Sequence, residues 1–317
     1  MAQRPLIAVG GENLIDHVTR DGEVAAHPGG SPFNVAMALG RLGANVAYIT
    51  PISTDDWGAR LADTLEASGV DLRGGRRDEP TTLSRVTVTK GIPSYDFQRD
   101  ATAERQVTTE SLSSALPDEA RAVHTGSLTL TDGPDADAWE AFCTTCADRG
   151  LVVSLDPNVR LSVIKDRDAY RARILRMAAH AHLVKLSDED LSGLFPDLDA
   201  DAAIATISEA APRTLLVMTR GPKGVSIWQD GARRDLPAPK VTSLVDTVGA
   251  GDTFMAATLA GLAREGALSP DAIASLEAAG LDAILTEAML AAAINCAREG
   301  CDPPTRNELD AAMQGAN

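Results

Sequence analysis

The sequence predicts a doubly wound α/β fold, in which helices cover both faces of a mostly parallel sheet. Six short runs are apolar nearly throughout, which is typical of strands buried on both faces of a parallel sheet. These runs are LIAVG (6–10), VAYIT (46–50), AVHTGSL (122–128), LVVSLDPN (151–158), HLVKLS (182–187) and TLLVMTRG (214–221). Helix-like segments separate the runs, and this alternation favours an α/β architecture.

The predicted helices lie between these strands in chain order. The clearest are SPFNVAMALGRLG (31–43), DDWGARLADTLEASG (55–69), DADAWEAFCTTCADRG (135–150) and DAAIATISEAA (201–211). A chain of 317 residues can bury a sizeable core without a disulfide or a structural metal. We therefore expect a single domain that spans residues 1–317.

Two stretches depart from the alternation of strands and helices. Residues 11–28 resemble a β-hairpin with its turn at Asp21-Gly22. Residues 81–107 contain RVTVT, whose alternation of polar and apolar residues indicates a half-exposed strand. Together they predict a small β-sheet outside the main sheet, and a small sheet beside an α/β core suggests a lid over the active site.

The charge of the chain restricts its partners. The formal net charge is −16 at pH 7, which argues against nucleic acid and against an anionic membrane surface as partners. A phosphate ligand stays compatible with this charge, provided that backbone amides, arginine, lysine or a metal ion form the site locally.

Neither the cysteines nor the apolar runs indicate a metal site, a secretory leader or a membrane anchor. Cys143 and Cys146 form a CxxC pair inside a predicted helix, where we expect buried structural thiols. Cys296 and Cys301 lack the spacing of a second zinc-ligand pair. The apolar run at the N-terminus has four residues, and no run approaches the roughly 18 residues of a membrane span. We expect a cytoplasmic protein with reduced thiols.

The stretch DTVGAGDTF carries the strongest chemical signal of the sequence. Gly249 and Gly251 allow the backbone to approach a ligand closely, and a nearly all-apolar helix follows. The unpaired N–H groups of the first turn of such a helix form an anion site. Asp252 at the mouth of this site could take a proton from a hydroxyl while phosphate charge develops beside it. The competing interpretation is that Asp252 is a simple helix cap.

Two signatures of the chain resemble the ribokinase-like (PfkB) family of carbohydrate kinases. DTVGAGDTF resembles the family's DTxGAGD motif, and GGSPFNVAMALGRLG (29–43) resembles its N-terminal glycine-pair motif. TRGPKG (219–224) resembles the family's nucleotide loop. The resemblance extends from about residue 6 to about residue 306, and it implies the ribokinase-like fold.

The resemblance implies a catalytic role for the glycine-rich turn. Asp252 would be the general base that deprotonates a primary hydroxyl of the sugar for attack on the γ-phosphate of ATP. The amides of Gly249, Ala250 and Gly251 would hold the phosphoryl group in transfer, a reaction that needs mainly positioning and charge stabilisation. Mg²⁺ would arrive with ATP.

The resemblance also assigns the substrate sites. On the sugar side it implies Asp16, Gly29, Gly30 and Asn34, and it adds Arg99 and Arg160 as cations for the sugar or a phosphate. On the ATP side it implies Lys185, Ser187, Thr219, Gly221, Gly224 and Gly251. For metals, Asp190 stands where the family has a glutamate that acts through magnesium-bound water, and Glu189 is the alternative. Asp246 would help to hold a monovalent cation such as K⁺, with weaker support for backbone carbonyls of 295–300.

Several runs are more similar to fructokinases than to ribokinases, among them GENLIDHV, DPNVR and VKLSDEDL. D-Fructose is therefore the expected acceptor, with fructose 6-phosphate as the product. Kinases for 2-keto-3-deoxygluconate, aminoimidazole riboside or ribose are the alternatives. A lid-to-lid homodimer is a further expectation by analogy.

Proteins of two other classes fit less well. A dinucleotide-dependent oxidoreductase would need GxGxxG after the first strand, whereas the sequence has Gly10-Gly11-Glu12-Asn13 there. A non-catalytic sugar-binding protein of the same fold should have lost the base or the glycines of the anion site, and both are present.

Overall fold

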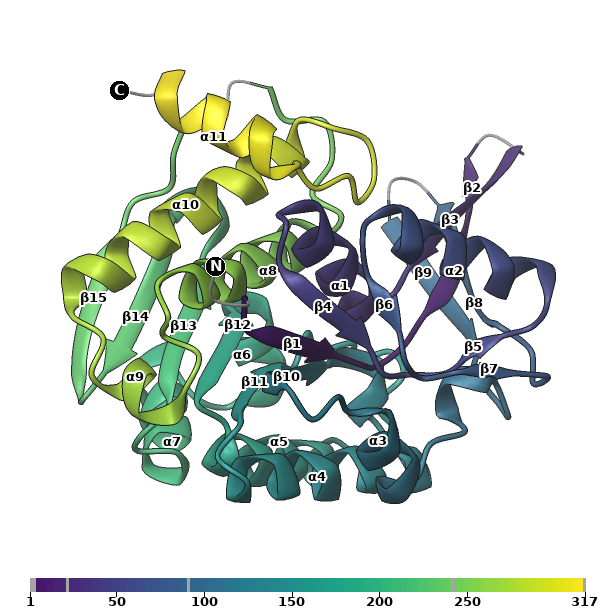
Figure 1. Cartoon of the computed structure of the whole chain (residues 1–317), viewed down its shortest axis with the longest axis horizontal. Coiled ribbons are helices and arrows are strands. Elements are labelled where there is room, and N and C mark those ends of the chain that lie inside the picture. Colours follow the sequence, from purple (N-terminus) through teal and green to yellow (C-terminus); the bar gives the residue numbers. More distant parts are fainter. Residues whose placement is uncertain (1–3, 21–22, 90–91, 241–242, 316–317) are drawn as a thin grey trace.

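We describe the protein from a computed structural model that covers residues 4–20, 23–89, 92–240 and 243–315 (Figure 1). Its large sheet has nine strands in the order β15-β14-β13-β12-β11-β10-β1-β4-β6. In chain order these are β1 (Leu6–Val9), β4 (Asn45–Tyr48), β6 (Asp71–Leu72), β10 (Ala120–Gly126), β11 (Val152–Asp156), β12 (Leu183–Ser187), β13 (Leu215–Thr219), β14 (Val225–Gln229) and β15 (Ala232–Leu236). Neighbouring strands pair in parallel from β6 at one edge through β4, β1, β10, β11 and β12 to β13. At the other edge β14 and β15 pair antiparallel. The six predicted buried strands are all present.

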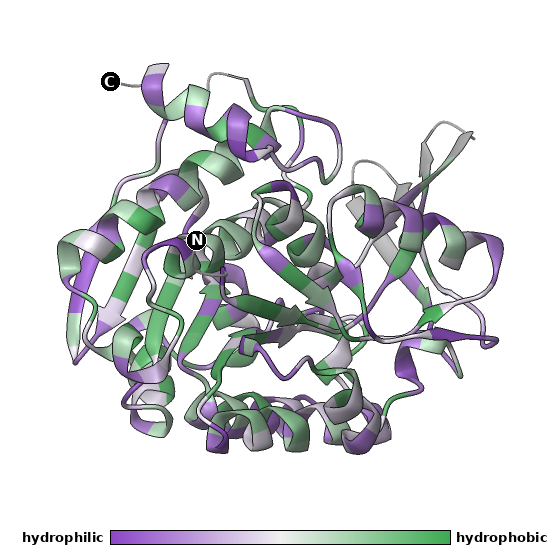
Figure 2. Ribbon diagram, in the orientation of Figure 1, coloured by the Kyte–Doolittle hydropathy of each residue, from purple (hydrophilic) through white to green (hydrophobic). Residues whose placement is uncertain are grey.

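Helices cover both faces of this sheet and bury two apolar clusters against it (Figures 1 and 2). One layer comprises α1 (Ser31–Arg41), α2 (Asp56–Ala67), α8 (Ala250–Arg264), α9 (Pro270–Ala274), α10 (Ala278–Cys296) and α11 (Arg306–Gly315). The other comprises α3 (Thr109–Ala115), α4 (Gly133–Asp148), α5 (Arg167–His180), α6 (Asp188–Leu194) and α7 (Ala200–Ala210). Figure 2 shows that the strands between the layers are mostly apolar, as expected for a sheet buried on both faces. The predicted doubly wound fold is confirmed.

A second sheet of four strands, in the order β3-β2-β8-β9, lies at one side of the large sheet (Figure 1). It consists of β2 (Leu14–Arg20), β3 (Glu23–Gly29), β8 (Thr82–Thr89) and β9 (Ile92–Gln98). The predicted small sheet is therefore present, although the expected turn at Asp21-Gly22 lies outside the described residues. β5 (Ile52–Ser53) and β7 (Arg76–Arg77) form a further two-stranded ladder. That the small sheet closes as a lid stays a prediction.

Among the boundaries that differ from the expected ones, two lie near the small sheet and the strand ends that face it. The strand expected over 122–128 ends at Gly126, where a Cβ would lie 1.8 Å from the Asp156 carbonyl oxygen, and the short helix η2 (Ser127–Leu130) follows. The end of the second lid segment is not part of the small sheet, because Ala103–Arg105 forms the short helix η1. The chain therefore leaves the small sheet several residues earlier than predicted.

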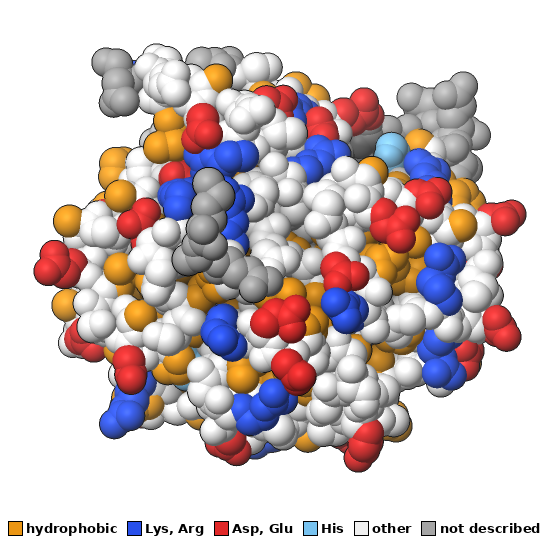
Figure 3. All heavy atoms as spheres, viewed as in Figure 1, with side chains coloured by type: hydrophobic (Ala, Val, Ile, Leu, Met, Phe, Trp, Pro, Cys, Tyr) orange, Lys and Arg blue, Asp and Glu red, His pale blue; other side chains and the backbone are white. Residues whose placement is uncertain are grey.

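Two of the four cysteines and the most apolar helix belong to the core. Cys143 and Cys146 lie in α4 with free, buried thiols, as expected. Within the described ranges, α10 alone is long and apolar enough to cross a membrane by length and composition. It packs on α8, and a core helix of a globular protein meets the same criteria. Figure 3 shows acidic side chains spread over the visible face beside basic ones, in keeping with the net charge.

Candidate active site

The site is organised around Asp252, which lies in the first turn of α8. This helix begins at Ala250, two residues earlier than the apolar pattern suggested, so the glycine-rich turn itself starts the helix. Gly249 precedes it as the N-cap with φ 73°, a left-handed conformation that favours glycine. Nearly every residue from Asp252 to Leu262 is buried. The helix start is therefore held firmly by the core.

The carboxylate of Asp252 is buried but polar in its contacts. The Ser31 hydroxyl donates a 2.7 Å hydrogen bond to Oδ1, and the Asn34 amide donates a 2.8 Å hydrogen bond to Oδ2. Both donors lie in the first turn of α1, so two helix N-termini meet at this carboxylate. Burial raises the pKa of Asp252, although these hydrogen bonds and the charges of Lys185 and Arg160 act in the opposite direction. A raised pKa strengthens the carboxylate as a base.

Two of the three expected anion-binding amides are free. Within the described chain the N–H groups of Gly249 and Gly251 donate no hydrogen bond, whereas Ala250 N–H lies 3.2 Å from the Thr247 carbonyl oxygen. This turn bond is at the long end of the usual range. At Gly249 a Cβ would lie 2.2 Å from Cys301 Sγ. The packing therefore requires glycine at the N-cap, and the available donors are Gly249 and Gly251 rather than all three residues.

A buried ion pair lies directly beneath this turn. Lys185 Nζ donates a 2.8 Å hydrogen bond to Asp156 Oδ2, and a Cβ on Gly251 would lie 2.8 Å from the same nitrogen. Burial raises the pKa of Asp156 to about 6, against the opposing charge of Lys185. Burial alone would lower the pKa of Lys185, but the carboxylates of Asp156, Asp190 and Asp252 hold it above its usual value. A fixed positive charge thus lies next to the free amides.

Four of the predicted sugar residues lie on β2, at the end of β3 and at the start of α1, namely Asp16, Gly29, Gly30 and Asn34. Asp16 of β2 pairs with His27 of β3, and its side chain reaches Gly29, where a Cβ would lie 2.5 Å from Asp16 Oδ2. Burial raises the pKa of Asp16, and the charges of His27 and Arg160 lower it. The exposed Arg160 donates to the backbone carbonyl oxygens of Asn158 and Val159, at 3.4 and 3.2 Å, and no hydrogen bond or ion pair joins it to Asp16 or Asp252 among the described residues. The backbone of Gly30 has φ 107°, and a Cβ there would lie 2.4 Å from the Glu12 carbonyl oxygen.

Asn34 has one buried polar atom that the described residues leave without a hydrogen bond. Its amide nitrogen binds Asp252, but its Oδ1 is buried and has no hydrogen-bond partner among the described residues. Buried polar atoms are rarely left unpaired. An oxygen acceptor beside the proposed base is therefore available to a ligand hydroxyl.

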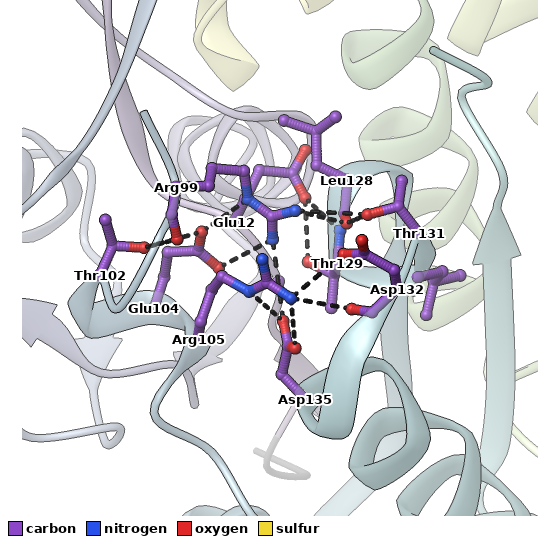
Figure 4. Close-up of polar contacts among 12 residues, drawn as sticks. Glu12, Arg99, Thr102, Glu104, Arg105, Leu128, Thr129, Thr131, Asp132 and Asp135 are labelled. Carbon is purple, nitrogen blue, oxygen red and sulfur yellow. Dashed lines mark hydrogen bonds and ion pairs between the residues drawn. The ribbon is translucent and has the colours of Figure 1, made fainter. Parts of the chain in front are cut away.

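Arg99 is not where the sequence suggested. It is 7% exposed, and its Nε donates to Glu104 at 2.9 Å while its Nη1 donates to the Leu128 carbonyl oxygen at 3.0 Å (Figure 4). The carboxylate of Asp135 lies 3.9 Å from its Nη2. The guanidinium group thus belongs to a buried ion network, and the structure does not bring it to Asp252. The resemblance that assigned Arg99 to the sugar or a phosphate did not reveal this, because the acidic partner Glu104 follows five residues later on η1.

Asp190 and Ser187 cap a helix. Ser187 is the N-cap of α6 and donates both its N–H and its hydroxyl to Asp190 Oδ2, at 2.8 and 2.7 Å. Val159 N–H donates to the other oxygen at 2.6 Å. Each oxygen of Asp190 thus already accepts a hydrogen bond, and only its remaining lone pairs could accept one from a metal-bound water. The side chain of Glu189, the alternative residue for this role, is exposed. No group of three or more His, Cys, Asp or Glu side chains that could hold a metal ion occurs in the described ranges.

The nucleotide loop follows β13. Thr219 ends the strand, and Gly221 has φ 52° with open space where a Cβ would be. Gly224 has φ 88°, and a Cβ there would lie 1.9 Å from the Leu236 carbonyl oxygen. Gly224 is therefore required by the close approach of the chain after β15, whereas Gly221 leaves room for a ligand.

Asp246 joins the loop before α8 to the loop after α10. Its Oδ1 accepts from the N–H groups of Thr247 and Val248, and its Oδ2 accepts from Gly300 N–H at 3.0 Å. The carbonyl oxygen of Cys296 accepts from Asp246 N–H at 3.2 Å. The segment 295–300, expected to supply carbonyl ligands for a monovalent cation, thus does lie beside Asp246.

Sequence reasoning missed three polar residues of this site. Ser31 binds Asp252, Glu12 binds the Ser31 backbone, and Asp156 binds Lys185. Glu12 and Asp156 each stand shortly after or at the end of a buried strand, in GENLID and DPNVR. The carboxyl ends of parallel strands are where ligand sites form, so their position was the available signal.

A buried carboxylate of raised pKa, free amides at a helix N-terminus and a nearby lysine have the chemistry that phosphoryl transfer requires. A family model described as pfkB family carbohydrate kinase matches residues 6–308. The chain therefore belongs to the pfkB family of carbohydrate kinases, as its two signatures suggested.

Similar proteins support the same class. A fructokinase from Rhizobium leguminosarum bv. trifolii is 42% identical over 275 residues, which cover 84% of this chain and 82% of that protein. Probable fructokinase-5 of Arabidopsis thaliana is 32% identical over 283 residues, covering 86% and 87%. The crystal structure of a fructokinase with bound ATP from Xylella fastidiosa superposes with a TM-score of 0.89, at 26% identity and 99% coverage of both chains.

Proposed function

We propose that the protein transfers the γ-phosphoryl group of ATP to the primary hydroxyl of D-fructose and forms fructose 6-phosphate and ADP. The observation that carries this proposal is Asp252, a buried carboxylate of raised pKa beside the free amides of Gly249 and Gly251. The fructokinase relatives support fructose as the acceptor.

In the proposed reaction each group has a distinct task. Asp252 takes the proton of the sugar hydroxyl, whose oxygen forms the new bond to the γ-phosphorus as the bond to the ADP oxygen breaks. The free amides and Lys185 stabilise the negative charge on the transferred group. Mg²⁺, bound mainly by water and phosphate oxygens, would neutralise further charge on ATP. Asp246 and the neighbouring carbonyl groups would hold K⁺ beneath the anion site.

The sugar would lie between the small sheet and α1. Asp16 would accept hydrogen bonds from sugar hydroxyls, the unpaired Asn34 Oδ1 would accept another, and Gly29 and Gly30 would leave room for the ring. Closure of the small sheet over the sugar would exclude water from the reacting centre. Residues 11–28 and 81–107 would then move relative to the large sheet.

The charge of this pocket favours a neutral sugar over 2-keto-3-deoxygluconate. The carboxylates of Asp16 and Asp252 face it, Lys185 is bound to Asp156, and Arg99 is bound to Glu104. Of the two arginines assigned to the sugar, only Arg160 could then pair with a carboxylate of the substrate. A sugar acid would therefore lose affinity relative to fructose.

An assay of ADP release across fructose, ribose, 2-keto-3-deoxygluconate, aminoimidazole riboside and adenosine tests the proposal. We expect fructose to give the highest kcat/KM by tenfold or more. A higher kcat/KM for another acceptor would replace fructose as the substrate. No release with any acceptor would favour a non-catalytic sugar-binding protein.

A further inference from the structure

A buried polar network joins the places where the chain passes between the two sheets. Glu12 lies between β1 and β2, Ser31 follows the passage from β3 to α1, and Thr82 begins β8. Arg99 and Glu104 lie where the chain leaves β9. All five residues are buried, at 7% exposure or less. Any movement of the small sheet must therefore act on this network.

Glu12 is at the centre of the network, with an exposure of 1%. Its Oε1 accepts a 3.0 Å hydrogen bond from Ser31 N–H, the first amide of α1. Its Oε2 accepts from the Thr129 hydroxyl at 2.9 Å and from Thr129 N–H at 3.3 Å. A carboxylate at a helix N-terminus satisfies a free amide and is favoured by the helix dipole. Glu12 therefore fixes the first turn of α1.

From Glu12 the contacts lead to the proposed base on one side and to the small sheet on the other. The hydroxyl of Ser31, whose amide Glu12 binds, donates to Asp252 at 2.7 Å. On the other side, Arg99 binds the carbonyl oxygen of Leu128, the neighbour of Thr129 (Figure 4). Glu104, the partner of Arg99, also accepts from the Thr82 hydroxyl at 2.9 Å. A continuous series of hydrogen bonds and neighbouring residues thus connects the start of β8 and the end of β9 with the carboxylate of Asp252.

We propose that Glu12 is a positioning residue for catalysis, which holds Ser31 against Asp252 and couples the position of the small sheet to the orientation of the base. Glu12 is one step removed from Asp252, because Ser31 lies between them. The coupling rests on the proposed function, since it concerns the base of the phosphoryl transfer. Its consequence is that sugar-driven movement of the small sheet would align the base when the acceptor is in place.

Variants of Glu12 test this role by kinetics. We expect Glu12→Ala to lower kcat by tenfold or more while the KM for ATP changes less than threefold, because the ATP residues lie on other elements. Glu12→Gln keeps one oxygen for Ser31 N–H and should recover at least a third of the wild-type kcat. All assays are run at a temperature where thermal melts show each variant fully folded.

A matched control separates positioning from general loss of a buried charge. Glu287 is a buried carboxylate that pairs with Arg264 and Arg306 at the far end of α8. Glu287→Gln should lower the melting temperature but keep kcat within twofold of wild type. If Glu12→Ala lowers kcat no more than Glu287→Gln does, Glu12 is only structural and the proposal is wrong.

A double-mutant cycle and a structure give further readouts. In a Ser31→Ala background, Glu12→Ala should cost less than threefold in kcat, since the hydroxyl that it positions is already gone. The full tenfold loss in that background would contradict the route through Ser31. A crystal structure of Glu12→Ala should show the Ser31–Asp252 hydrogen bond broken, whether or not the wild type phosphorylates fructose. An intact 2.7 Å bond would overturn the proposal independently of the assay.

Discussion

Replacement of Asp252 by asparagine tests the base most sharply, because the structure allows the change without loss of packing. The side chains are nearly equal in size, and the amide oxygen can still accept from Asn34. The Ser31 hydroxyl can reverse and accept from the new NH₂ group, since a hydroxyl both donates and accepts. What the variant loses is the basic carboxylate.

The expected loss follows from the role of a general base. Such a group contributes about 10²- to 10⁴-fold in rate, or roughly 3–5 kcal/mol of activation free energy. We therefore expect Asp252→Asn to lower kcat by at least a hundredfold in the ADP-release assay, while the Kd for ATP measured by calorimetry changes less than threefold. A variant with more than a tenth of the wild-type kcat would remove Asp252 from the proton transfer.

Both the kcat of the wild type and the difference in melting temperature between wild type and Asp252→Asn should depend on pH. Burial raises the pKa of Asp252 in the folded protein, so kcat of the wild type should fall as the pH falls through that raised value. The same shift means that the ionised carboxylate costs folding stability at higher pH. Asp252→Asn should therefore melt at a higher temperature than wild type at pH 8, and the difference should shrink at acidic pH. An equal difference at every pH would contradict a raised pKa.

Three further substitutions follow from the contacts described. Gly249→Ala should lower kcat at least tenfold, because the new Cβ would meet Cys301 Sγ at 2.2 Å and shift the anion-binding turn; a kcat within twofold of wild type would refute this packing argument. Asp16→Ala should raise the KM for fructose at least tenfold and the KM for ATP less than twofold, whereas equal effects would argue against a sugar contact. Arg99→Ala should destabilise the fold by about 3–5 kcal/mol in urea unfolding, because the buried Glu104 loses the cation that pairs with it, and should change the KM for fructose less than threefold. A large rise in that KM would restore Arg99 to the sugar site.

The fold could be predicted from sequence because its strongest signals are local. The apolar runs that became β1, β10 and β12 reflect burial on both faces, and that pattern is visible in a single strand. The order of the strands and the pairing of β2 with β8 depend on contacts between distant segments, and no local pattern encodes them. The start of α8 was misplaced because glycine is unfavourable inside helices, whereas here Gly249 is the N-cap, where the packing against Cys301 requires it, and Gly251 lies in the first turn.

A site residue could be predicted where a motif coincides with its chemistry, as at Asp252. The prediction was weaker where contacts between distant segments determine where a side chain lies and what it binds. Arg99 follows an aromatic residue as a lid arginine would, yet Glu104 and Asp135 bind it in the interior. Glu12 and Ser31 carry no distinctive spacing, because their bond spans 19 residues and forms only when β2 pairs with β3 and brings the two residues together. Such partners could be found only in the structure.

The most direct test of the account is a crystal structure with fructose, ADP and a metal fluoride that mimics the phosphoryl group in transfer. The account predicts that the fluoride accepts hydrogen bonds from Gly249 and Gly251 N–H, and that the primary hydroxyl of fructose lies about 2.6–3.2 Å from the carboxylate of Asp252. A metal fluoride bound away from these amides, or a sugar hydroxyl that approaches no oxygen of Asp252, would contradict it.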